Sequence, residues 1–221
     1  MASLNSCASI AMCEIKQTLT YNNTPMLTLS ISYPKVTLPY CPCAQDSINF
    51  KIQSQVCGFL HYVSGDLYQQ AIAVYQESQE NGFPFRLYEA VLKYEITYNQ
   101  HCHFSLYRDR YTFTGGAHGS TVRASDTWNL MSGCGIPLSG FFPAGQDYRT
   151  SLTDQITRQA NENSEALFED YQALIVKYFN EEQYYLTSSG VAIYYQQYEI
   201  APYSTGIVVF SIPYMDPSCC K

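Results

Sequence analysis

The chain has 221 residues and carries 12 lysines and arginines against 19 aspartates and glutamates, which gives a net charge of −7 at neutral pH. Its basic residues are scattered along the sequence, and this excludes the basic stripe by which proteins follow the phosphates of nucleic acids. An acidic surface instead favours encounter with a basic protein. The length allows a core that is stable without a metal or a disulfide.

The cysteines and the N-terminus bear on cofactors and compartment. The nine cysteines are irregularly spaced, and their odd number leaves at least one unpaired. Because the paired ligands of a tetrahedral zinc site are missing, we predict reduced thiols, no metal and no cofactor. The first residues, MASLNSCASIAMCEIK, lack the basic start and apolar core of a signal peptide, and no apolar run is long enough for a membrane helix. We therefore expect a cytoplasmic protein without a membrane segment, or an extracytoplasmic one if the natural chain is longer.

The first third of the chain predicts two strands and a long helix. Residues 14–20 and 26–38 alternate between apolar and polar side chains, and Pro25 and Pro34 mark strand ends or edges. Asp46 then caps a helix that bends near Gly65 and stops at ENGFP, residues 80–84. Its apolar positions follow helical spacing and need a sheet to pack on: Ile48, Ile52, Val56, Phe59, Leu60, Val63 and Leu67.

A half-exposed strand and a histidine pair follow. In FRLYEAVLKYEITYN, one parity is apolar and the other is polar, which predicts a strand with one buried face. Further on, Phe104 and Leu106 share a parity, which places His101 and His103 together on the opposite face. Such a pair can hold a metal only with a third ligand, which the sequence does not specify. The alternative is two solvent-facing histidines near Glu89 or Glu95.

Glycines then mark a hairpin. RYTFT runs into GGAHG and out through STVRASDTWNL, so two strands flank a turn in which Gly115, Gly116 and Gly119 can take positive φ. Asp126 shares its parity with Trp128 and is a candidate buried carboxylate, which would need hydrogen-bond partners.

The remainder predicts two helices and then strands. Tyr148, Leu152, Ile156 and Ala160 recur every four residues, and Ser164 can cap a second helix. The segments YYLT, VAIYYQQY and GIVVFSIPY read as strands. The content of 21 tyrosines also favours sheets. We predict an α+β fold: an antiparallel sheet with helices packed mainly on one face, one long helix in the N-terminal half and a helix pair in the C-terminal half.

Two stretches resemble a known family. GGAHGSTVRASDTWNLMSGCGIPLSGFF and YYLTSSGVAIYYQQYEIAPYSTGIVVFSIPY are similar to the domain of lysozyme-sensing anti-sigma factors of the RsiV type. Residues 1–100 resemble the companion domain that also precedes the catalytic domain of PdaC-type peptidoglycan deacetylases. The resemblance implies an N-terminal subdomain over 1–100 and an RsiV-like subdomain over 101–221 that share one core. It also implies a protein-binding module, because the deacetylase chemistry belongs to a separate domain.

We favour a non-catalytic domain that recognises lysozyme or peptidoglycan fragments. Sugar rings stack on aromatic faces, and four tyrosines could form such a platform around Glu199, with Pro202 fixing the bend: Tyr194, Tyr195, Tyr198 and Tyr203. The alternative is that YEIAPY is a structural corner with tyrosines in the core.

Two other hypotheses stay open. One is a glycan hydrolase or deacetylase-related enzyme in which His118 is the general base, Asp126 orients it and Ser120 lies nearby. It lacks a G-x-S-x-G or H-E-x-x-H motif, so we expect His118 to anchor the turn instead, by a hydrogen bond across it towards YEIAPY. The other is a cytoplasmic structural or partner-binding protein of a Gram-positive bacterium.

Overall fold

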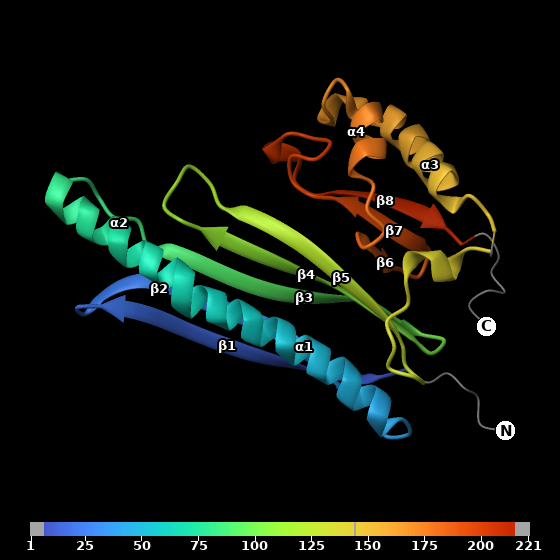
Figure 1. Cartoon of the computed structure of the whole chain (residues 1–221), viewed down its shortest axis with the longest axis horizontal. Helices are drawn as coiled ribbons and strands as arrows, with labels where there is room; N and C mark the ends of the chain where they lie inside the picture. The colour runs from blue at the N-terminus through green and yellow to red at the C-terminus, as the bar shows by residue number, and fades with distance from the viewer. Residues whose placement is uncertain (1–6, 144, 215–221) are drawn as a thin grey trace. The chain divides into compact units, whose positions relative to one another are not determined.

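A computed structural model describes residues 7–143 and 145–214 and shows two sheets (Figure 1). A five-stranded sheet has the order β1-β2-β3-β4-β5, and a three-stranded sheet has the order β6-β7-β8. The strands are β1 Ser9–Tyr21, β2 Thr24–Thr37, β3 Tyr88–Gln100, β4 His103–Phe113, β5 Ser120–Asn129, β6 Tyr184–Leu186, β7 Gly190–Tyr195 and β8 Val208–Pro213. The helices are α1 Pro42–Tyr62, α2 Tyr68–Asn81, α3 Tyr148–Glu162 and α4 Tyr171–Tyr178. This confirms the α+β class, the long helical segment and the later helix pair.

The contacts divide the chain into two compact units. The N-unit contains Ser9–Tyr94 and Arg108–Val122. The C-unit contains Glu95–Tyr107 and the described residues from Arg123 onward, together with Cys7 and Ala8. Each of β3, β4 and β5 therefore supplies residues to both units. The division of the chain at residue 100 stays a prediction.

The five-stranded sheet is not antiparallel throughout. β1 and β2 form an antiparallel hairpin, but β2 pairs in parallel with β3, with Leu27–Ser32 opposite Tyr88–Lys93. The predicted antiparallel arrangement is wrong for this pair, because the helical segment between the two strands is a crossover that allows the same strand direction. Pro25 and Pro34 both lie within β2, yet outside Leu27–Ser32, so neither removes a hydrogen bond to β3.

One long helical segment covers the N-unit core. α1 and α2 pack against β2 and are joined by a π-helical turn at Val63–Leu67, which contains Gly65, the position where a bend was predicted. The helix begins at Pro42 rather than at the predicted cap Asp46, because proline is favoured in the first turn, where its missing N–H costs nothing. It ends at Gly82, which takes φ 73°. The buried stripe is Ile48, Ile52, Val56, Phe59, Val63, Leu67 and Ala71.

The C-unit core lies between β6–β8 and the two later helices. Every residue of β7 is buried, since this strand is central in its sheet. α3 is capped by Asp147, whose side chain accepts from Thr150 N at 3.2 Å. The predicted cap Ser164 instead opens a 3₁₀ turn, and α4 begins only after Asp170. Core members include Tyr98, Leu152, Ile156, Ile175, Ile193 and Phe210.

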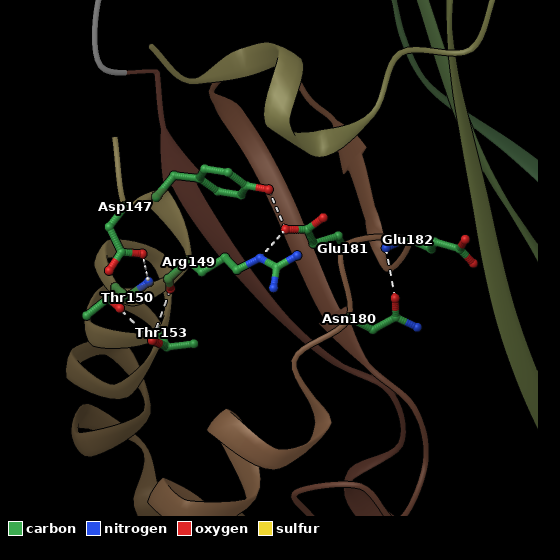
Figure 2. A network of polar contacts seen from close by, with 8 residues as sticks. Asp147, Arg149, Thr150, Thr153, Asn180, Glu181 and Glu182 are labelled. Carbon is green, nitrogen blue, oxygen red and sulfur yellow. Dashed lines mark hydrogen bonds and ion pairs between the residues drawn. The ribbon is translucent and has the colours of Figure 1, made fainter. Parts of the chain in front are cut away.

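A polar network joins the first turn of α3 to the segment before β6 (Figure 2). The Glu181 carboxylate accepts hydrogen bonds from the Tyr148 hydroxyl and, at 2.6 Å, from Arg149 Nε. The hydrogen bonds from Arg149 and then Tyr148 lower the pKa of Glu181. The network therefore connects the start of α3 to the segment before β6, although an exposed ion pair of this kind adds little stability. In the described part of the chain, no helix is both long and apolar enough to cross a membrane.

Candidate functional site

The YEIAPY segment forms a corner after β7 in the C-unit. Tyr198 takes φ 67°, a left-handed backbone that a bulky side chain seldom adopts, and its side chain is 55% exposed. Pro202 precedes a 3₁₀ turn at Tyr203–Thr205. The ring centroids of Tyr198 and Tyr203 lie 5.9 Å apart with a 35° tilt. We call these two rings the Tyr198–Tyr203 pair, and they are the part of the predicted platform that reaches solvent.

Hydrogen bonds hold this corner in place. Gln196 Nε2 donates to Arg123 O at 2.7 Å, and Arg123 N donates to Gln196 Oε1 at 2.9 Å. The glutamine amide thus pairs with the β5 backbone as a neighbouring strand would. Ile200 and Ala201 are buried, and Ile200 O accepts from Phe168 N at 3.0 Å. The backbone that carries the exposed Tyr198 ring and the half-buried Tyr203 ring is therefore fixed.

Glu199 lies half-buried beneath the corner. Its Oε2 accepts a hydrogen bond from Gln196 N at 2.6 Å. Burial raises the pKa of Glu199, while the hydrogen bonds from the Gln196 backbone and the Gln183 side chain favour its charged form. The carboxylate is thus held by Gln196 and Gln183, and its charge acts on the buried Tyr195 hydroxyl, whose pKa is raised by burial and also by this charge.

Two of the four platform tyrosines are not available. Tyr194 and Tyr195 are each only 1% exposed, so the predicted platform is wrong at these positions. Both belong to the central strand β7, whose two faces are covered. Tyr195 Oη donates to Ile175 O at 3.0 Å, and burial raises the pKa of Tyr195. These two rings are core, but they precede YEIAPY. The alternative that placed the tyrosines of YEIAPY in the core is wrong for Tyr198, which is 55% exposed.

The GGAHG loop joins β4 to β5 as predicted. Only Gly115 of its three glycines takes positive φ, at 82°. Arg86 Nη1 donates to the carbonyl of Gly116 at 3.1 Å, which ties the loop to the segment before β3. Gly119 packs closely for a different reason, because a Cβ there would lie 2.3 Å from the end of the Tyr111 ring, which would have to move. The glycines thus serve the shape and packing of the turn.

His118 is exposed on this loop. Its Nδ1 lies 3.0 Å from Gly119 O, a contact within the turn itself. Asp126 is only half-buried on β5, although Trp128 and Leu130 of the same parity are buried as predicted. His118 belongs to the N-unit and Asp126 to the C-unit, so their pairing in a catalytic group stays a prediction. The same holds for the expected bond from His118 towards YEIAPY.

The two histidines at the start of β4 do not share a strand face. His101 takes φ 49° in the two-residue turn between β3 and β4, and His103 is the first residue of β4. The prediction of one extended segment is wrong here, because the turn falls between Gln100 and His103. Burial lowers the pKa of His103, which contacts the Phe141 ring at 6.1 Å between centroids. Within residues 7–143 and 145–214, no group of three or more His, Cys, Asp or Glu side chains could hold a metal.

Sequence reasoning missed the residues that support the corner. The Arg123 guanidinium lies 3.7 Å from the centre of the Tyr107 ring and 5.9 Å from that of Tyr194. Such cation–π contacts stabilise a partly buried arginine. The signal available was weak: Gln196 directly follows the apolar strand β7, and Arg123 is the charged residue on the polar parity of β5.

Fold and site together define a two-sheet α+β protein with an exposed aromatic corner. Residues 20–121 match the family described as "Deacetylase PdaC", and residues 139–215 match "Protein of unknown function (DUF3298)". The chain therefore combines a region similar to PdaC with a region similar to DUF3298 proteins, consistent with the resemblance to RsiV-type domains and to the N-terminal region of PdaC-type deacetylases. No curated protein matches the sequence.

Solved structures share this fold. A member of the DUF3298 family from Bacteroides fragilis NCTC 9343 is 20% identical, with a TM-score of 0.72 over 95% of this chain and 92% of that one. A DUF3298 family protein from Pseudomonas aeruginosa PAO1 is 17% identical, with a TM-score of 0.61 over 94% and 90% of the two chains. At these identities the likeness shows the fold alone, and it extends over nearly the whole length of this chain.

Proposed function

We propose that this chain is a non-catalytic recognition domain that binds lysozyme through the Tyr198–Tyr203 pair. The observation that carries the proposal is the conformation of Tyr198, which is both left-handed and more than half exposed. A strained backbone that is held by its surroundings, as the Gln196 and Ile200 hydrogen bonds hold this one, is common at binding sites. Rigid exposed tyrosines give a large contact area at little cost in entropy.

Charge supports a basic partner. The chain carries −7, and lysozyme is a basic protein, so the two attract at long range. The resemblance to lysozyme-sensing domains points to the same partner, and it covers the strand and corner that present the two rings. Association should therefore weaken as salt is added.

A cell-wall glycan is the second candidate, and the ring geometry favours it. An exposed tyrosine face stacks on the apolar face of a sugar, and the neighbouring Glu199 carboxylate can accept from a hydroxyl or an N-acetyl group. Glycan binding of this kind buries little charge and should depend only weakly on salt.

The hydrolase hypothesis has less support. The Nδ1 atom of His118 faces the carbonyl of its own loop, which is the position that an orienting carboxylate holds in a catalytic group. A turnover assay of the native chain on peptidoglycan and on small esters tests this point. Product release that disappears in His118→Ala would make the protein an enzyme.

Isothermal titration calorimetry tests the binding proposal. The native chain is titrated with purified lysozyme and, separately, with soluble peptidoglycan fragments, each at low and high salt. Saturable heat with lysozyme that weakens at high salt supports the first candidate. Saturable heat with the fragments alone supports the second. If neither lysozyme nor the fragments give saturable heat, both candidate functions are contradicted.

A further inference from the structure

A groove in the N-unit lies between α1 and the β4–β5 hairpin. It has a volume of about 280 Å³ and is lined by Phe59, Tyr62, Arg110, Thr112, Ser120 and Val122. Phe59 is buried and forms the floor, while Tyr62 and Val122 are exposed at the sides. The ring centroids of Phe59 and Tyr62 lie 6.4 Å apart with a 41° tilt. The volume is close to the lower end of the range for small-molecule sites.

Unused polar groups converge on this groove. Arg110 is exposed, and within the part of the chain that the structure describes its guanidinium has no hydrogen-bond or ion-pair partner. Among the same described residues, the hydroxyls of Tyr62, Thr112 and Ser120 also have no partner. The groove therefore offers one cation and three hydroxyls above an apolar floor.

The groove carries a positive charge in a protein whose net charge is negative. Arg108 lies two residues before Arg110 on β4 and so belongs to the same strand face, but it does not line the groove and already has an interaction partner, so Arg110 supplies the charge. Both arginines lie in a protein of net charge −7. A guanidinium binds a carboxylate by two parallel hydrogen bonds, which fixes both the sign and the shape of the ligand group.

We propose that this groove is a binding site for a small organic carboxylate with a flat aromatic body. Arg110 binds the carboxylate, the ring lies against Phe59, Tyr62 and Val122, and the Thr112 and Ser120 hydroxyls reach the remaining polar atoms. The site is independent of the Tyr198–Tyr203 pair, which belongs to the other unit, and it does not rest on the proposed recognition of lysozyme or glycan.

Two probes of nearly equal shape test whether the groove prefers a negatively charged ligand. Indole-3-acetate carries the carboxylate, and indole-3-acetamide has the same ring and length without the charge. Both are titrated into the ¹⁵N-labelled chain, and amide shifts are followed by nuclear magnetic resonance. We expect saturable shifts around Phe59, Thr112 and Val122, and at least about tenfold tighter binding of the acetate, the size of a charge-assisted hydrogen bond.

Variants locate the effect. Arg110→Gln should reduce the affinity for indole-3-acetate to that for the amide, and Arg110→Lys should restore part of it. Arg158→Gln removes an exposed arginine of α3 and controls for the change in net charge; its affinity should stay native. Circular dichroism confirms that each variant is folded. Equal affinity for the two probes, an unchanged affinity in Arg110→Gln, or shifts confined to other parts of the chain would overturn the proposal.

Discussion

Tyr198 departs further from the ordinary behaviour of its residue type than the other residues of the corner. A left-handed backbone costs a non-glycine residue about 1–3 kcal/mol, and here the surrounding hydrogen bonds maintain it. Asn22 and Asn23 also take positive φ, but asparagine tolerates that region, so their turn needs no special cause. The sequence could point to YEIAPY as a corner, but it could not show which tyrosine faces solvent.

The buried tyrosines show why the rest of the site was not predictable. Tyr194 and Tyr195 follow each other in a strand, so their side chains point to opposite faces, and the predicted platform required both to reach solvent. Both are buried because β7 is covered on its two faces, and that depends on where α3, α4 and β5 residues pack. A local pattern contains no information on packing from distant segments. Gly115, by contrast, was predicted correctly from the turn alone.

Glu199→Gln tests the electrostatics of the corner. Because burial raises the pKa of Glu199, its stabilising contribution is fully present below about pH 4.5, the ordinary value, and is lost as pH rises through the raised folded-state pKa. The glutamine variant cannot ionise. We expect the two proteins to differ little near pH 4 and the variant to gain relative stability towards pH 8, measured by urea unfolding at each pH.

Glu165→Gln is the matched control, since it removes an exposed charge of the same unit. Its stability relative to the native chain should change little over this range. If the difference in the free energy of unfolding between Glu199→Gln and the native chain stays constant with pH, burial does not perturb the pKa of this carboxylate.

At the level of elements, periodicity predicted most of the fold. The stripe from Ile48 to Leu67 is buried as expected except at Leu60, and the apolar parity of β3 is buried except at Ile96; both of these side chains are half-buried. Errors fall at boundaries and at pairing: the start of α1, the cap of α4, the turn at His101 and the parallel β2–β3 pair. These depend on competing caps and on which strand a long crossover returns to, neither of which is encoded in a local pattern.

Gly190→Ala tests the packing of the second sheet. A Cβ at this position would lie 2.0 Å from the backbone oxygen of Ile212, so β7 and β8 must separate to admit it. We expect a loss of about 1–3 kcal/mol in the free energy of unfolding, as for other overpacked cores. Gly58→Ala in α1 is the control, because nothing lies within 4 Å of its Cβ. That variant should gain about 0.5–1 kcal/mol, and chemical denaturation compares the two. Native stability in Gly190→Ala would mean that the strands are less closely packed than described.

For the molecule as a whole, the two compact units do not correspond to two consecutive pieces of the chain, because β3, β4 and β5 each supply residues to both units. β3 ends in the C-unit, where Tyr98 belongs to the core and Thr97 Oγ1 donates to Ser105 O at 3.2 Å. Asn99 also exchanges two hydrogen bonds with Ala8, at 2.9 and 2.8 Å. The C-unit thus includes some residues that precede position 101, namely the end of β3 from Glu95 onward and Ala8.

A fragment of residues 101–221 should therefore fail to fold cooperatively, because it lacks Tyr98 and the end of β3. We expect weak near-ultraviolet circular dichroism and a broad thermal transition, against a sharp transition for the whole chain. A fragment with a sharp transition and native-like spectra would show that the C-unit core is complete without these residues.

The most direct test of the recognition proposal compares two tyrosines. Tyr198→Asn removes the exposed ring but keeps a residue that accepts a left-handed backbone. Tyr40→Asn removes a 96% exposed tyrosine of the N-unit and is the matched control. Calorimetric titration with lysozyme should show at least about tenfold weaker binding for Tyr198→Asn, as for an interface hot spot, and native affinity for Tyr40→Asn. Native affinity in both variants would contradict binding through the Tyr198–Tyr203 pair.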